Sequence, residues 1–250
     1  MKFIDDTPEL GEFVTPYPKY PPVRNILKEK HIPGKLIVFE GPDGSGKSTQ
    51  VQLLKEKLIK SDIQATTFSY IKSNLIRHTL LKGKWENYDP FTSTFIYLTA
   101  LTDLMNREIL PRLYNGEIVI LDRYIYSIIG KGVVRGIKEE WFHSFLHYLF
   151  QPHFTIYIDT PVDICWQRKD AKGSSPSYWE CGMDMFPDDQ LRYRKISELS
   201  KDCFITYQNN MKHIIKNQIP KQNSLIINGE NEIRLLNKKI YLKTISLIEQ

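Results

Sequence analysis

Short apolar runs alternate with longer segments of helical periodicity over residues 35–250. The apolar runs have the length of buried strands, and they are Leu36–Phe39, Ala65–Ser69, Ile118–Leu121, Thr155–Ile158 and Leu225–Ile227. The segments between them predict helices over Lys47–Lys60, Thr92–Tyr114, Glu139–Phe150, Pro161–Lys169, Asp189–Lys216 and Glu230–Ser246. This alternation predicts an α/β fold of three layers, with helices on both faces of a five-stranded parallel sheet.

Residues 1–34 do not share this pattern. Prolines in the run Thr15–Pro22 lack a backbone donor and restrict the residues before them, so this stretch does not form a regular helix. We therefore expect an N-terminal extension rich in proline and tyrosine over residues 1–34 and one domain over residues 35–250. Composition favours a tail over a ligand for a proline-binding module.

The composition is that of a globular protein. Its 250 residues carry a formal net charge of +5, which suits a protein that handles phosphates and is too weak to indicate a nucleic acid polymer as partner. Cys165, Cys181 and Cys203 lie far apart in the sequence, without metal-site spacing, as expected for reduced thiols. Because no apolar run reaches membrane-spanning length, we expect a cytoplasmic protein with no membrane partner.

The segment Gly41–Ser48 fits the pattern G-x-x-x-x-G-K-[ST] of a phosphate-binding loop, between a predicted strand and a predicted helix. Its glycines allow the backbone to aim N–H groups at an anion, and the helix adds a positive dipole end. Lys47 supplies a cation for the β- and γ-phosphates, and the Ser48 hydroxyl can ligate Mg²⁺. The predicted ATP contacts are Gly41, Pro42, Asp43, Gly44, Ser45, Gly46, Lys47, Ser48 and Thr49.

Charged residues also follow the next predicted strands, where ligands of a parallel sheet bind. Asp122 comes directly after the third strand and can hold Mg²⁺ together with Ser48. Arg123 offers a planar fork to a phosphate, although an Asp–Arg pair that only caps a strand end is the alternative. Lys72 follows the second strand and is either a further phosphate ligand or a solvated surface lysine.

These segments resemble the thymidylate kinase family. The resemblance rests on Phe39–Gln50, on Asp122–Ser127 and on the helix and turn Ile109–Gly116. The runs Tyr178–Asp184 and Phe204–Gln208 are similar to those of bacterial thymidylate-kinase-like proteins. The resemblance implies a P-loop kinase fold and Mg²⁺-dependent transfer of the ATP γ-phosphoryl group to a nucleoside 5′-monophosphate, first of all dTMP to dTDP.

The same resemblance implies roles for acceptor-site residues. Asp43 matches the acidic residue that meets the 3′-hydroxyl of the acceptor, and a carboxylate that only stabilises the loop is the alternative. Lys72 stands where the family usually has an arginine that holds the acceptor phosphate beside Arg123. The family also keeps acceptor contacts just after the Asp-Arg-Tyr element, which points to Ser127 and Arg135.

A basic helix end and a stretch rich in glycine, serine and proline predict a lid over about residues 168–190. The phosphate loop lacks the arginine that some family members carry there, so the resemblance shifts the transition-state cation to this lid. Arg168 is the first candidate and Lys172 the second, with a solvated basic face as the alternative. The predicted catalytic residues are therefore Lys47, Asp43, Arg123, Arg168 and Lys172.

The sequence departs from the family where the base is read. Leu98 and Thr102 occupy the usual places of an aromatic residue and an arginine, and the nearest arginine is Arg107. Aromatic residues such as Phe91, Phe95 and Tyr97 are expected in the core. The run Gly130–Gly136 lacks the spacing of a dinucleotide-binding fingerprint.

Two rival functions remain open. One is a kinase of the same fold that acts on another deoxynucleotide or on a nucleoside. The other is a nucleotide-binding regulatory protein without turnover, against which the intact Lys47, Ser48, Asp122 and Arg123 argue. The resemblance also implies a homodimer through the helices at Thr92–Tyr114 and Glu139–Phe150.

Overall fold

The computed structural model describes residues 32–73, 76, 78–79, 82, 88–146, 149–171, 173, 176–185 and 196–249. Most of the predicted N-terminal extension and the candidate lid residue Lys172 lie outside these residues. None of the described helices is long and apolar enough to cross a membrane.

A sheet of five parallel strands forms the centre of the molecule, as predicted. The strands are β1 Lys35–Glu40, β2 Ala65–Phe68, β3 Ile118–Asp122, β4 Phe154–Asp159 and β5 Ser224–Asn228. Their spatial order is β2-β3-β1-β4-β5. Each strand agrees with a predicted one to within one residue at either end. Because β1 lies between β3 and β4, the carboxyl ends of all three meet at one edge of the sheet.

Helices connect the strands. They are α2 Lys47–Ile59, α4 Pro90–Leu104, α5 Leu110–Tyr114, α6 Ile125–Val134, α7 Glu140–Leu146, α8 Val162–Asp170, α10 Ile196–Gln218 and α11 Ile233–Ile248. A π-helical turn, η2 Met105–Ile109, joins α4 to α5, so the predicted helix over Thr92–Tyr114 is one helical run with a change of winding. Pro111, which lacks a backbone donor, follows that turn. Two 3₁₀ turns are η1 Tyr70–Lys72 and η3 Met183–Met185.

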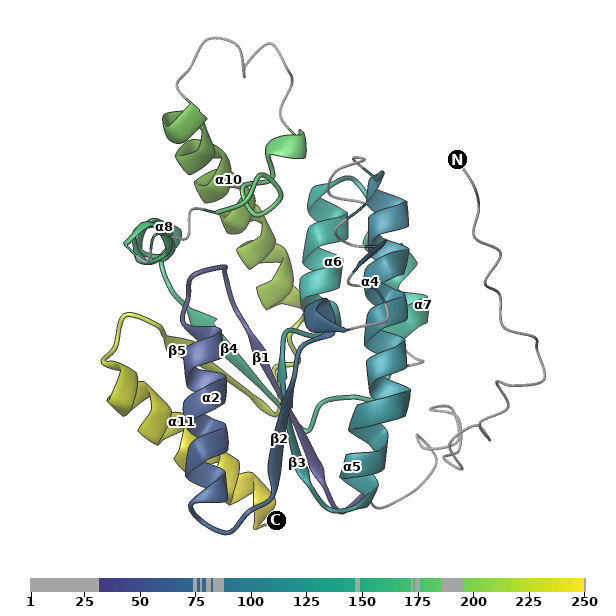
Figure 1. Ribbon diagram of the computed structural model, residues 1–250, viewed down its shortest axis with the longest axis vertical. Coiled ribbons are helices and arrows are strands. Elements are labelled where there is room, and N and C mark those ends of the chain that lie inside the picture. Colours follow the sequence, from purple (N-terminus) through teal and green to yellow (C-terminus); the bar gives the residue numbers. More distant parts are fainter. Residues whose placement is uncertain are drawn as a thin grey trace, which may run out of the picture.

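The helices cover both faces of the sheet, which confirms the predicted three layers. In β1, Leu36 and Val38 pack into a core shared with α4, α5, α6 and α10. Ile37 and Phe39 point to the opposite face and pack with α2 and α11. Figure 1 shows α2 and α11 on one side of the strands and α4, α5 and α6 on the other. Alternation of the strand side chains thus divides the interior into two cores.

Helix α6 was not among the predicted elements. It is short, and Gly130 and Gly132 are poor helix formers that weaken the helical signal of the segment. These two glycines allow α6 to pack closely against its neighbours. A Cβ at Gly130 would lie 2.8 Å from Ile215 of α10, and one at Gly132 would lie 2.6 Å from Phe142 of α7, both too close for a side chain. A glycine-containing segment that looked irregular in sequence is therefore a central helix beside the candidate site.

Candidate active site at the carboxyl edge of the sheet

The loop after β1 has the conformation that its glycines allow. Gly44 and Gly46 have φ angles of 87° and 99°, which side chains other than glycine rarely adopt. A Cβ at Gly44 would also lie 2.5 Å from the carbonyl oxygen of Cys165. Lys47 begins α2, and its Nζ donates to the carbonyl oxygens of Gly41 at 2.8 Å and Pro42 at 2.7 Å. The ammonium group is therefore held across the loop.

Lys47 is only 6% exposed, and this burial has an electrostatic consequence. Burial, together with the neighbouring charge of Arg123, lowers the pKa of Lys47 to about 8. The carboxylates of Asp43, Asp122 and Glu40 oppose the shift. An anion bound in the loop would favour the protonated lysine, so the loop and its lysine fit a phosphate group.

Ser48 and Asp122 meet because β1 and β3 are neighbours. The Ser48 hydroxyl donates to Oδ2 of Asp122 at 2.7 Å. A hydroxyl and a carboxylate oxygen are ligands that Mg²⁺ accepts, with phosphate oxygens and water completing its octahedron. The described residues contain no cluster of three or more histidine, cysteine, aspartate or glutamate side chains that could hold a metal. The Ser48 hydroxyl and the Asp122 carboxylate can therefore supply two oxygen ligands to a Mg²⁺ ion.

A cavity of about 580 Å³ lies over the loop, and we call it the donor cavity. Arg168 of α8 reaches across it, with Nη2 donating to the Gly229 carbonyl at 2.9 Å and Nη1 to the Ser45 carbonyl at 3.4 Å. The next residue, Lys169, pairs with Glu180 at 2.9 Å. The described part of the predicted lid thus brings two basic side chains to the donor cavity.

Arg123 and Asp43 form an ion pair at the floor of the site. Arg123 has a φ of 73°, and its backbone N–H donates to the Phe39 carbonyl at 3.0 Å. Its Nη1 donates to the Ser127 hydroxyl at 2.9 Å, and that hydroxyl donates to Glu40 at 2.5 Å. Burial alone would raise the pKa of Asp43, but Arg123 and Lys47 outweigh it and hold this pKa well below its usual range. Asp43 is therefore a carboxylate at neutral pH.

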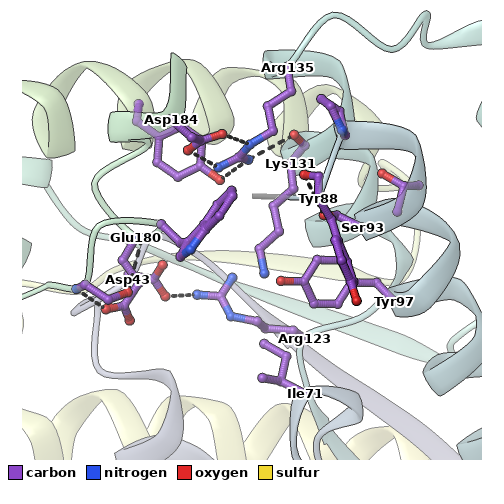
Figure 2. A pocket seen from close by; sticks show the side chains of 15 residues that line it. Asp43, Ile71, Tyr88, Ser93, Tyr97, Arg123, Lys131, Arg135, Glu180 and Asp184 are labelled. Carbon is purple, nitrogen blue, oxygen red and sulfur yellow. Dashed lines mark hydrogen bonds and ion pairs between the residues drawn. The ribbon is translucent and has the colours of Figure 1, made fainter. Parts of the chain in front are cut away.

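A second cavity, of about 440 Å³, lies on the other side of this ion pair, and we call it the acceptor cavity. Its walls come from α4, α6, α10 and the turn at residues 177–184, as Figure 2 shows. The lining residues are Asp43, Ile71, Tyr88, Pro90, Ser93, Thr94, Tyr97, Arg123, Lys131, Arg135, Ser177, Trp179, Glu180, Asp184 and Tyr207. Asp43, Arg123 and Glu180 line both cavities, so the two spaces meet at these side chains.

Comparison with known proteins agrees with this architecture. A family model described as thymidylate kinase matches residues 39–240. The chain belongs to the thymidylate kinase family. A probable thymidylate kinase 2 of Saccharolobus solfataricus is 30% identical over 214 residues, which cover 85% of this chain and 95% of that protein. A thymidylate kinase of Chlamydia caviae is 33% identical over 173 residues, or 65% of this chain and 80% of its own length. A probable thymidylate kinase of Pyrococcus abyssi is 27% identical over 181 residues, 69% of this chain and 87% of that protein.

The family assignment confirms the resemblance found in the sequence and the enzyme class that it implied. ATP is the phosphoryl donor that membership implies, and the phosphate-binding loop with its donor cavity is the feature of this thymidylate kinase family member that fits it. The structure brings Asp43, Lys47, Ser48, Asp122 and Arg123 together at the carboxyl edge of the sheet, where the sequence placed them.

Other predicted site residues lie elsewhere than expected. Lys72 is exposed and lines a separate cavity of about 620 Å³ with Ser48 and Asp122. It does not line the acceptor cavity; its neighbour Ile71 does. Ser127 is fully buried beneath Arg123, so it holds that arginine in place and does not face a cavity.

Arg135 lines the acceptor cavity but has its donors engaged. Its Nε and Nη2 donate to the two carboxylate oxygens of Asp184, at 2.8 and 3.0 Å, and Nη1 donates to the Tyr207 hydroxyl at 2.7 Å. The guanidinium also lies 5.9 Å from the Trp179 ring centroid. Arg135 thereby joins α6 to α10 and to the turn at residues 177–184, which we call the lid turn. These contacts make Arg135 a support of the cavity wall.

Helix α4 presents a different face to the acceptor cavity than the sequence suggested. Leu98 is buried in the core, and Arg107 lines the cavity that contains Lys72. The α4 side chains that reach the acceptor cavity are Pro90, Ser93, Thr94 and Tyr97. The expectation that the aromatic residues here belong to the core was wrong for Phe91 and Phe95, which are 48% and 49% exposed.

Gln208 of α10 is a site residue to which the sequence alone assigned no role. It stood only at the end of the run Phe204–Gln208, which resembles that of related kinases. It is 1% exposed, and its amide is used at both ends. Oε1 accepts the Asp43 backbone N–H at 3.1 Å, while Nε2 donates to Asp43 Oδ2 and to the Glu180 carbonyl, each at 3.1 Å. Gln208 therefore ties the phosphate loop to the lid turn. No local pattern marks this role, because its partners are 165 and 28 residues away.

Proposed function

We propose that this protein transfers the γ-phosphoryl group of ATP to dTMP, giving dTDP and ADP, with Mg²⁺. The observation that carries the proposal is the meeting of two cavities at Asp43, Arg123 and Glu180. One cavity has a phosphate-binding loop, and the other has the size and the mixed aromatic and polar lining of a nucleotide pocket. A phosphoryl group passes between substrates only when donor and acceptor are held in line and their charge is neutralised.

On the donor side, we assign the phosphates of ATP to the backbone N–H groups of the loop and to Lys47. To reach a phosphate, the Lys47 ammonium exchanges its bonds with the carbonyls of Gly41 and Pro42 for charged oxygens. Ser48 and Asp122 would hold Mg²⁺, which neutralises charge on the β- and γ-phosphates when bound.

On the acceptor side, Asp43 is proposed to accept a hydrogen bond from the 3′-hydroxyl, and Arg123 to contact the 5′-phosphate. Asp43 suits its task because it remains ionised near neutral pH. Arg123 suits its task because Ser127 and Asp43 fix the plane of its guanidinium. Arg135 keeps the wall of the cavity in place through Asp184.

The lid is proposed to supply the cation of the transition state. Arg168 contacts the Ser45 carbonyl within the phosphate loop, so a modest change in its side chain would bring it to a bound γ-phosphate. Lys172 remains the second candidate from the sequence. Closure of the lid would also exclude water and limit hydrolysis of ATP.

A coupled assay of ADP release over nucleosides and 5′-monophosphates tests the function. We expect turnover with dTMP and little with thymidine, because buried cations left without a phosphate make rejection of the nucleoside strong. The preference for dTMP over dUMP should be smaller, since one methyl group changes kcat/KM by only about 10–200-fold. Efficient phosphorylation of thymidine with dTMP inert would overturn the proposal in favour of a nucleoside kinase.

We also propose a homodimer through the surface formed by α4 and α7. Phe91 and Phe95 are exposed, and their rings contact Trp141 of α7 edge to face, at 6.0 and 5.3 Å between centroids. Exposed aromatic clusters of this kind mark interaction surfaces. Light scattering of the purified protein gives its mass, and a monomer at assay concentrations would contradict this assembly. The cytoplasmic location stays a prediction from the sequence.

A further inference from the structure

The acceptor cavity needs a second cation for the phosphate of its substrate. This inference rests on the proposed function, which brings the acceptor 5′-phosphate to the meeting point of the two cavities. At that point Arg123 is paired with Asp43, so the charges of this ion pair cancel. A phosphate monoester carries close to two negative charges at neutral pH, because its second pKa is about 6. Arg123 alone therefore leaves most of the substrate charge without a partner.

The described residues that line the acceptor cavity offer three cations, Arg123, Lys131 and Arg135. Arg135 is committed to Asp184 and Tyr207, in the wall formed with the lid turn. Lys72, which the sequence favoured for this task, lines a different cavity. Lys131 is the remaining cation whose side chain reaches the acceptor cavity.

The helix geometry puts Lys131 beside Arg123. Lys131 follows Ser127 by four residues within α6, so both side chains lie on the same face of that helix. The Ser127 hydroxyl accepts a hydrogen bond from Arg123, which places the guanidinium one helical turn from Lys131. Lys131 is also among the charges that lower the pKa of Asp43.

The ring of Tyr97, on α4, helps to hold the Lys131 ammonium over the cavity. Nζ lies 4.5 Å from the centroid of this ring, the arrangement of a cation–π contact. In Figure 2 the Lys131 side chain runs from α6 into the cavity, with its ammonium beside Tyr97 and directed toward Arg123. An ammonium group carries three donors and a point charge, which suit the oxygens of an anionic ligand in this cavity.

We propose that Lys131 binds the 5′-phosphate of the acceptor together with Arg123, in the role that the sequence assigned to Lys72. The fork of Arg123 fixes the orientation of the phosphate, and the point charge of Lys131 completes its neutralisation. The ligand class is a nucleoside 5′-monophosphate, and the contact is with the phosphate and not with the base or the sugar.

Calorimetric titration of dTMP and of thymidine tests this assignment in the full-length protein. Lys131→Met keeps the length and apolar stem of the side chain but removes the charge. We expect the Kd for dTMP to rise about 10- to 100-fold, the range of a lost hydrogen bond to a charged group, while the Kd for thymidine stays unchanged. Lys131→Arg should recover much of the dTMP affinity. If thymidine binds too weakly for calorimetry, its inhibition constant against dTMP gives the same comparison.

Two further variants make the test specific. Lys138→Met removes an exposed lysine just beyond α6 and should bind both ligands as the wild type does. Lys72→Met tests the rival residue, and a phosphate-dependent loss confined to that variant would overturn the proposal. An equal loss of dTMP and thymidine affinity in Lys131→Met would overturn it too, because Lys131 would then contact the nucleoside. If the wild type does not phosphorylate dTMP, the proposed function fails; if it does and Lys131→Met binds dTMP normally, only this inference fails.

Discussion

The donor and acceptor cavities share three side chains and differ in how the chain builds them. The donor cavity takes eight of its lining residues from one continuous segment, Asp43–Gln50. The acceptor cavity collects its lining from the helices α4, α6 and α10, from the lid turn and from residues after β2 and β3. One site is thus a local backbone structure, and the other is assembled by tertiary packing.

The two cavities also differ in the chemical groups that they offer to a ligand. The donor cavity relies on the backbone N–H groups of the loop and on basic side chains, Lys47 in the loop and Arg168 and Lys169 in α8, so its selectivity is for phosphate charge. The acceptor cavity relies on side chains that are held in place by other side chains, as Arg135 is by Asp184 and Asp43 by Gln208. We therefore expect single charge removals to act most strongly on the donor side. On the acceptor side, changes in supporting residues should act mainly on the affinity for the acceptor.

The largest effect is expected for Lys47→Ala. It removes the only loop side chain that carries a positive charge to the transferring phosphates, so kcat should fall by at least about 100-fold. Thermal stability should not fall in parallel, because burial of the charged lysine is unfavourable in the free protein. Steady-state kinetics and a melting curve measure the two quantities. Lys60→Ala, at the exposed end of α2, is the matched control and should leave both unchanged.

If folded Lys47→Ala protein kept near-wild-type turnover, Lys47 would not be the residue that binds the phosphates of ATP. The continuous segment Asp43–Gln50 would then not be the phosphate site, and the donor phosphates would bind elsewhere.

A smaller effect is expected for Gln208→Glu on the acceptor side. The substitution keeps an oxygen for the Asp43 N–H but replaces the amide donor with a carboxylate that faces Asp43. We expect kcat/KM for dTMP to fall about 10- to 100-fold with little change in KM for ATP. The added negative charge also raises the pKa of Asp43, so the acidic limb of the pH–rate profile should move to higher pH.

Asn209→Asp adds the same charge at the neighbouring, exposed position and serves as the control. A uniform loss of activity with no shift of the acidic limb would mean that Gln208 only stabilises the fold. Equal effects on the KM values for ATP and dTMP would break the proposed division between the two cavities.

The sequence could predict the sheet and the donor site because both are encoded locally. Each strand is a short apolar run, and the loop follows β1 with glycines at the positions that require positive φ. The sequence also placed Asp122 next to Ser48, since residues after neighbouring parallel strands meet at one edge.

The acceptor site could not be predicted to the same extent, for two physical reasons. Gly130 and Gly132, which weaken the sequence signal for α6, are required for its packing against Ile215 and Phe142. The direction of side chains on α4 depends on how the helix is rotated against α6, which put Tyr97 into the cavity and left Phe95 exposed. Such rotations follow from packing of many residues and leave no local pattern.

The smallest effect concerns the pH dependence of ATP binding on the donor side. The pKa of Lys47 is lowered to about 8 in the free protein, and a bound polyphosphate should raise it again. Above that pH the free protein must take up a proton in order to bind ATP, so affinity should fall about threefold from pH 7.5 to 8.5 and approach a tenfold loss per unit above about pH 9. Calorimetry in two buffers of different ionisation enthalpy at pH 8.5 would show proton uptake on binding. Lys47→Arg, which stays charged, should show neither the fall in affinity with pH nor the proton uptake.

A wild-type Kd that is constant from about pH 7 to 9.5 would mean that Lys47 does not titrate in this range. The donor cavity would then offer ATP a lysine that stays charged throughout this range, in addition to the backbone N–H groups of the loop.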